Sequence, residues 1–249
     1  MLLTTIMLLV SALIVGVLVG CVGIGGVLLP PVLVYGGGLN LHLAMATAMW
    51  SFLFTGVVGT IAYSRRNSVD WRMVAWLGAG IVPAAVLGAL SNAALPAEVL
   101  MVLLATLITA TGVNAFAKGS SAERTAHSFS PFLLLQIGMV VGFGSALTGT
   151  GGPVLLVPIL VFLRAPTLSA IGVSQVVQIP VAISSTLGNV LFGQVDFSLG
   201  TTLGLVAAAG VVIGTSIAHA VPILTLRRTV AVSLVASGVL IAMRAFAAG

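Results

Sequence analysis

The sequence has very little charge. Of its 249 residues, only 5% are Asp, Glu, Lys or Arg, whereas 59% are hydrophobic. A soluble domain of this length carries about 25% charged residues, so water is excluded as the main solvent of this chain. The nine basic residues are spread thinly along apolar segments, and the net charge of +5 therefore forms no stripe for binding nucleic acid. The composition predicts a polytopic integral membrane protein.

Cysteine and acidic residues are also scarce. The single cysteine, Cys21, excludes an intramolecular disulfide and a cysteine-based metal cluster. The four acidic residues fall at segment edges or in a polar linker, which argues against a carboxylate proton relay inside the membrane, with Glu98 as the residue to test. The three histidines lack metal-ligand spacing, and no nucleotide-binding or catalytic-triad motif occurs. We therefore expect no enzyme activity, cofactor, metal site or ATP-driven pump.

Long apolar runs account for most of the chain. A helix needs roughly 20 apolar residues to cross a bilayer, and six segments meet this length: Leu43–Tyr63, Arg72–Asn92, Ala97–Ala117, Leu168–Phe192, Phe197–His219 and Pro222–Arg244. Two further regions are interrupted by glycine clusters: Leu2–Cys21 before Gly26–Tyr35, and Pro131–Leu147 before Pro153–Leu163. Each predicts a long helix, a break inside the membrane and a short half-helix. Such a break must be buried in protein or line a cavity, because lipid cannot bind its backbone polar groups.

The sequence repeats itself at an ungapped offset of 126 positions. This offset aligns Gly16, Gly23, Gly25 and Gly26 with Gly142, Gly149, Gly151 and Gly152, and Val69-Asp70-Trp71 with Val195-Asp196-Phe197. One register holds for most of each half, which indicates a duplicated unit. We predict an N-terminal repeat over 1–117, a cytoplasmic linker over 118–130 and a C-terminal repeat over 131–249, joined in one transmembrane domain.

Basic residues predict how the two repeats are oriented, since short cytoplasmic loops collect Lys and Arg. Arg65, Arg66 and Arg72 flank a loop of the first half, whereas the matching loop around Gly193–Phe197 has none. Arg164, Arg227 and Arg228 in the second half have no basic counterparts in the first. These loops share one side if the repeats are inverted. The predicted fold is all-α, with two inverted-topology repeats of about four full membrane helices plus a half-helix each.

The two breaks are the candidate site. Each would aim a helix N-terminus, with unpaired N–H groups and a partial positive charge, at the middle of the membrane, where a small anion could bind. Pro153 suits a first helical turn. The alternative is that the glycines only let helices pack closely, as expected for Gly16-x-x-x-Gly20 and Gly210-x-x-x-Gly214. Buried polar side chains on neighbouring segments must likewise bind something or bond between helices. The candidate substrate-binding residues are Gly25, Gly26, Trp50, Ser51, Thr148, Thr150, Gly151, Gly152, Ser174, Gln175, Gln178 and Asn189.

These motifs resemble those of the sulfite exporter TauE/SafE family, also called the TSUP permeases. The resemblance covers nearly the whole chain and rests on Gly23-Ile24-Gly25-Gly26 with Pro30, on Gly149-Thr150-Gly151-Gly152 with Pro158, and on the Val-Asp-Trp/Phe elements at Val69 and Val195. It implies a transporter in a bacterial or archaeal inner membrane that moves sulfite, thiosulfate, sulfoacetate or other organosulfonates.

The function expected from these features is secondary transport by alternating access, with the anion held between the repeats. Because no acidic carrier is evident, a coupled proton would travel on the substrate, as bisulfite, or transport would be uncoupled. A passive anion channel, or a carrier of another small solute or a metal ion, stays open as an alternative. So does the choice between monomer and homodimer.

Overall fold

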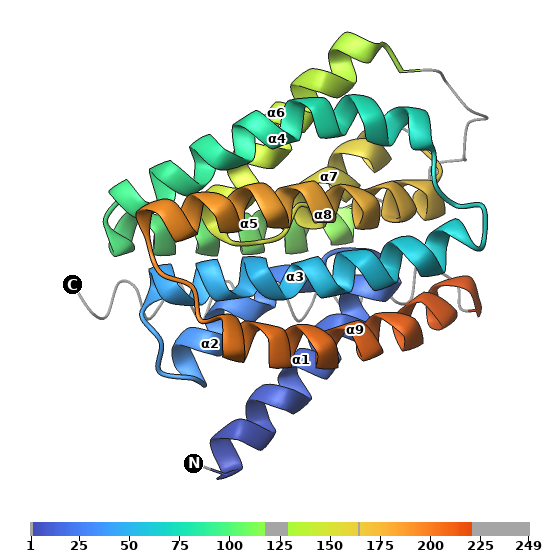
Figure 1. Cartoon of the computed structure of the whole chain (residues 1–249). Coiled ribbons are helices and arrows are strands. Elements are labelled where there is room, and N and C mark those ends of the chain that lie inside the picture. The colour runs from blue at the N-terminus through green and yellow to red at the C-terminus, as the bar shows by residue number, and fades with distance from the viewer. Residues whose placement is uncertain (1, 118–128, 164, 221–249) are drawn as a thin grey trace.

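The computed structural model describes residues 2–117, 129–163 and 165–220, and these residues form helices joined by short connections (Figure 1). The helices are α1 (Leu2–Val22), the 3-10 helix η1 (Gly25–Leu28), α2 (Leu29–Tyr35), α3 (Leu41–Ser64), α4 (Trp71–Ala94), α5 (Ala97–Ala117), α6 (Pro131–Thr148), α7 (Pro153–Phe162), α8 (Thr167–Phe192) and α9 (Phe197–Ala220).

Six of the described helices, α1, α3, α4, α6, α8 and α9, are long and apolar enough to cross a membrane. This confirms the prediction of an all-α polytopic membrane protein. The predicted span Pro222–Arg244, and all but the last two residues of the predicted linker 118–130, lie outside the described residues.

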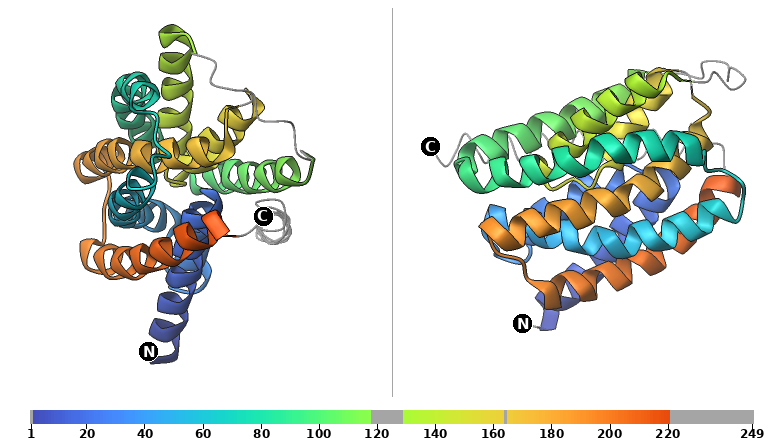
Figure 2. Two further views of the ribbon diagram at one scale, coloured as in Figure 1. Left: turned by 90° about the vertical axis from the view of Figure 1, so that its right-hand side faces the viewer. Right: turned by 45° about the horizontal axis from the view of Figure 1, so that its top comes forward.

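The long helices form two layers, which overlie one another in Figures 1 and 2. The first layer contains α1, α3 and α9, and the second contains α4, α6 and α8; the most extensive helix contacts outside the α3–α8 pair lie within these layers. Each layer therefore combines helices from both halves of the chain. The layers meet along α3 and α8, which run antiparallel, since Gly56 lies against Gln178 and Gly172 against Tyr63.

Glycines allow the helices within each layer to approach closely. A Cβ atom at Gly20 of α1 would lie 2.5 Å from the carbonyl oxygen of Val211 in α9, and one at Gly142 of α6 would lie 2.7 Å from that of Ile81 in α4. Without side chains at these positions the backbones pack directly, which is a common source of stability between membrane helices. The packing interpretation of the Gly16-x-x-x-Gly20 and Gly210-x-x-x-Gly214 pairs is confirmed.

Two pairs of helices begin at positions related by the 126-residue offset of the sequence repeat. α3 and α8 begin at Leu41 and Thr167, and α4 and α9 at Trp71 and Phe197, so each pair is 126 positions apart. Asp70 accepts a hydrogen bond from the N–H of Met73, and Asp196 accepts one from the N–H of Leu199, so both carboxylates cap the helix that follows. These correspondences, with the antiparallel α3 and α8, are what two inverted copies would produce.

Candidate functional site

Both predicted helix breaks are present. α1 ends at Val22 and the chain continues as η1 from Gly25, while α6 ends at Thr148 and α7 begins at Pro153. Gly23 and Gly149, the first glycine of each break, have φ of 76° and 67°. Residues with a side chain rarely adopt this left-handed conformation, whereas glycine adopts it readily. The two glycine clusters therefore end their helices for the same local reason.

The two breaks differ in backbone conformation. Gly151 and Gly152 have φ of 83° and 91°, so the chain turns sharply before α7. In the first break, Gly25 and Gly26 already belong to the 3-10 helix that leads into α2. A Cβ atom at Gly25 would lie 2.5 Å from Cβ of Leu18, so this glycine packs against α1 within its own hairpin.

The breaks lie against each other in the protein interior. A Cβ atom at Gly26 would lie 3.1 Å from the carbonyl oxygen of Thr150, and one at Gly23 would lie 3.5 Å from Cβ of Pro153. Phe52 of α3, which is fully buried, touches both breaks. Two segments more than 120 positions apart in the sequence thus form one buried site beside the middle of α3.

The second break offers hydrogen-bond donors from the main chain. Among the described residues, nothing accepts a hydrogen bond from the N–H groups of Gly151 or Gly152. These groups directly precede α7, whose first residue is Pro153. A helix N-terminus carries a partial positive charge of about half an elementary charge. Buried N–H groups that find no partner are costly, so this turn is suited to an anionic ligand.

Hydroxyl groups near the second break are engaged with the backbone or with one another. Thr148 donates to the carbonyl oxygen of Gly144 at 2.7 Å, and its Oγ1 lies 3.0 Å from Oγ1 of Thr150. Because the hydroxyl of Thr148 is already donating, the hydroxyl of Thr150 is the donor of that second bond. Ser174 of α8 donates to the carbonyl of Ile171, and its Oγ would lie 3.4 Å from a Cβ at Gly23.

The two glutamines of α8 have different surroundings. Gln178 donates through Nε2 to Oγ1 of Thr55 at 2.9 Å, and its Cα would lie 4.0 Å from a Cβ at Gly152. Gln175 donates through Nε2 to the carbonyl oxygen of Val19 in α1 at 2.9 Å, close to the end of that helix. Both side chains are at most 1% exposed, and neither Oε1 atom has a hydrogen-bond partner in the described part of the chain. Gln178 thus lies beside the second break, whereas Gln175 links α8 to α1.

Three of the predicted site residues lie elsewhere. Trp50 donates through Nε1 to Oγ1 of Thr201 in α9, and Ser51 donates to the carbonyl of Ala48 in its own helix. Asn189 lies three turns beyond Gln178 in α8, where its Nδ2 is 3.4 Å from Oγ of Ser185. The fold therefore brings together the two breaks, Ser174 and Gln178, but not Trp50, Ser51 or Asn189.

Two residues at the site were missed in the sequence. Phe52 occupies the position that the 126-residue offset matches to Gln178, and this correspondence is the signal that could have revealed it. Asn92 of α4 donates through Nδ2 to the carbonyl oxygen of Leu147 at 2.7 Å, next to the second break. The sequence feature that could have predicted this contact is an amide side chain at the end of an apolar span.

The three acidic residues in the described part of the chain lie at helix starts and not at the breaks. Asp70 and Asp196 cap α4 and α9, Glu98 lies in the first turn of α5, and Glu123, the fourth acidic residue, lies outside the described residues. Within the described ranges no group of three His, Cys, Asp or Glu residues could hold a metal ion. The polarity of the break region comes from main-chain groups, hydroxyls and amides.

Comparison with known proteins identifies the family of this chain. The profile of the sulfite exporter TauE/SafE family matches residues 7–241, which is nearly the whole chain. The chain belongs to the sulfite exporter TauE/SafE family. It is accordingly a multi-pass membrane transporter.

Named relatives of this TauE/SafE protein are described as probable membrane transporter proteins. YjnA of Bacillus subtilis is 25% identical over 226 residues, which cover 84% of this chain and 89% of the relative. YdhB of the same organism is 21% identical, and the match covers 91% of this chain and 95% of YdhB. A protein of Xylella fastidiosa is 28% identical over 167 residues, and the match spans 64% of each chain. No solved structure matches the chain.

Proposed function

We propose that this TauE/SafE protein is a secondary transporter of small sulfur-containing anions such as sulfite, thiosulfate or organosulfonates. The observation that carries this proposal is the meeting of two glycine breaks at Phe52, where the N–H groups of Gly151 and Gly152 before α7 find no acceptor in the described part of the chain. A helix N-terminus buried away from water favours a negative ligand. Broken helices that meet between repeats are a recurrent substrate site in secondary transporters.

The anion would be held by main-chain donors and oriented by neighbouring side chains. Gly151 and Gly152 would supply N–H groups, and the amide of Gln178, which lies beside Gly152, would supply a further polar contact. We propose alternating access around a site formed by two inverted repeats, in a bacterial or archaeal inner membrane, with any coupled proton carried by the anion itself.

Transport by purified protein in liposomes tests the proposal. We expect saturable uptake of ³⁵S-labelled sulfite, and accelerated exchange when unlabelled sulfite is present on the opposite side. A passive channel would conduct without saturation and without this exchange. If sulfite, thiosulfate and sulfoacetate all fail to move in protein of native stability, the proposed substrate class is wrong.

Substitution of Gln178 tests the site. Gln178→Leu keeps the side-chain volume but removes the amide, and we expect the KM for sulfite to rise roughly tenfold, the effect of losing one hydrogen bond to a charged ligand. The matched control is Asn189→Leu, which removes an amide from the same helix far from the breaks. Equal transport by the Gln178 variant and the wild type would remove this amide from the site.

A further inference from the structure

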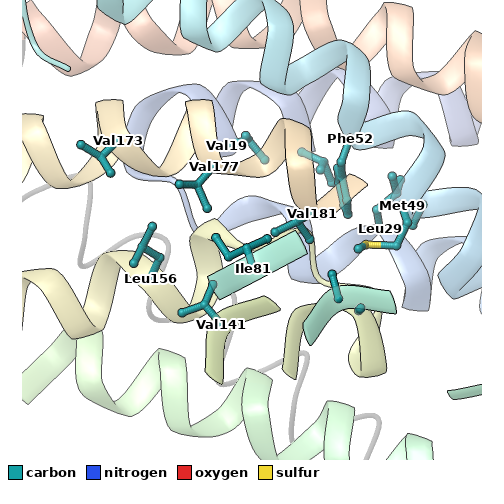
Figure 3. Packing of buried hydrophobic residues seen from close by; sticks show 14 of the residues in the cluster. Val19, Leu29, Met49, Phe52, Ile81, Val141, Leu156, Val173, Val177 and Val181 are labelled. Atoms are coloured by element: carbon teal, nitrogen blue, oxygen red, sulfur yellow. The ribbon is translucent and has the colours of Figure 1, made fainter. Parts of the chain in front are cut away.

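Phe52 packs against both breaks where they meet, and different edges of its ring face each one. A Cβ atom at Gly26 would lie 3.2 Å from Cζ and 3.3 Å from Cε1 of this ring. A Cβ atom at Gly151 would lie 2.6 Å from Cδ2 and 3.0 Å from Cε2, on the opposite edge. Both glycines thus provide the space that the ring fills. Figure 3 shows Phe52 at this point with Leu29, Met49 and Val181 around it.

The ring makes the site asymmetric. The offset of 126 positions matches Phe52, which touches both breaks, to Gln178, which lies beside the second break. One wall of the site therefore carries a polar amide and the other an aromatic ring. A solute bound at the N–H groups of Gly151 is next to this ring. A solute that reaches both breaks must take over space that the ring occupies.

We propose that Phe52 is the gate and size filter of the anion site: its ring fills the space beside Gly26 and Gly151 until a solute displaces it, and its bulk limits which solutes fit. This inference rests on the proposed function, because it assigns a role within that same site. The ring edge suits the role, since it is apolar yet carries a partial positive charge that tolerates an anion. Shortening the side chain should admit anions with longer apolar groups.

The test compares the uptake of hexanesulfonate with that of sulfite in proteoliposomes. In Phe52→Ala we expect the ratio of hexanesulfonate to sulfite uptake to rise about tenfold or more, because extra space in an apolar pocket admits additional methylene groups. The control is Phe54→Ala, two residues along α3, where the ring packs against Trp50; its ratio should stay within about twofold of the wild type. Phe52→Leu, which makes a smaller cavity, should shift the ratio in the same direction. An unchanged ratio in folded Phe52→Ala or Phe52→Leu overturns the proposal.

A stability measurement separates this proposal from the proposed function. Gly26→Ala places a methyl group against the ring, so it should lower Tm in detergent, and by a smaller amount when Phe52 is already Ala. Strictly additive changes in Tm would show that Gly26 and Phe52 do not interact, and the proposal that Phe52 acts as a gate would be wrong. If the wild type moves neither anion but the effects of the two substitutions on Tm are coupled, the proposed substrate class is wrong. The contact of the Phe52 ring with Gly26 then still holds.

Discussion

Asn92 is a buried amide that completes a helix end inside the membrane. The last carbonyl groups of a helix have no partner within that helix, and lipid cannot supply one. Asn92 donates Nδ2 to the carbonyl oxygen of Leu147, the penultimate residue of α6, and also lies 3.2 Å from Sδ of Met45. The side chain is 2% exposed. This amide therefore fixes α6 at the point where the second break begins.

Replacing Asn92 should cost stability without touching the main-chain donors of the site. In Asn92→Ala the carbonyl of Leu147 loses its partner, so we expect a loss of about 1–3 kcal/mol in the free energy of unfolding. Thermal unfolding in detergent measures this change. The control is the neighbouring Ser91→Ala, whose hydroxyl bonds only to the carbonyl of Leu87 in its own helix. Equal Tm values for the two variants would contradict the role given to Asn92.

At the scale of the helical element, α4 and α6 pack closely through small residues. A Cβ atom at Gly80 of α4 would lie 2.9 Å from the backbone nitrogen of Met139 and 3.1 Å from the carbonyl carbon of Leu135, both in α6. Gly78, half a turn away, has open space around its Cα. Two glycines of one helix therefore serve different purposes: one permits contact with α6, and the other makes no contact that needs a glycine.

This difference gives a paired prediction. Gly80→Ala should destabilise the protein by about 1–3 kcal/mol, because α4 and α6 must separate to admit the methyl group. Gly78→Ala should be neutral or stabilising by up to about 1 kcal/mol, since alanine favours helix over glycine. Thermal melts of the two variants in the same detergent provide the comparison. A loss of stability in Gly78→Ala as large as that in Gly80→Ala would contradict the packing argument.

At the scale of the whole molecule, the two layers differ from the two halves of the sequence. α9 packs with α1 and α3, and α4 packs with α6 and α8, so each half contributes helices to both layers (Figure 2). Moving 1–117 as one body against 131–249 would break the glycine contacts within each layer. If alternating access occurs as proposed, we expect the layers to move relative to each other along α3 and α8.

Cross-linking tests this expectation. With Cys21 replaced by Ala, a pair of cysteines at Trp50 and Thr201 joins two helices of one layer, because these side chains are hydrogen bonded between α3 and α9. A pair at Met45 and Asn92 joins the layers, because these side chains are in contact between α3 and α4. Joining the first pair with a short bis-methanethiosulfonate reagent should preserve sulfite uptake, and joining the second pair should stop it until the cross-link is reduced. The reverse result would show that the layers are not the moving bodies.

The site shows where prediction from sequence succeeds and where it stops. A cluster of glycines between two apolar runs predicts the break at Gly149 and Gly151, and both residues adopt a positive φ in the structure. The sequence places Asp70 and Asp196 at segment edges, and the structure shows that both cap the helix that follows. Trp50 was grouped with the site as a polar-edged residue in an apolar helix, yet it faces α9. Phe52, two residues further on, touches both breaks.

The sequence by itself determined the membrane as solvent, the positions of the spans and the two glycine breaks, because each depends on composition or on the conformational limits of a few adjacent residues. The tertiary structure alone decided how each helix is rotated, and so which side chains meet at the breaks. In a soluble protein an apolar stripe marks the buried face of a helix. Lipid is as apolar as the protein interior, so in α3 and α8 only the packing of neighbouring helices selects Phe52 and Gln178 as the residues beside the breaks.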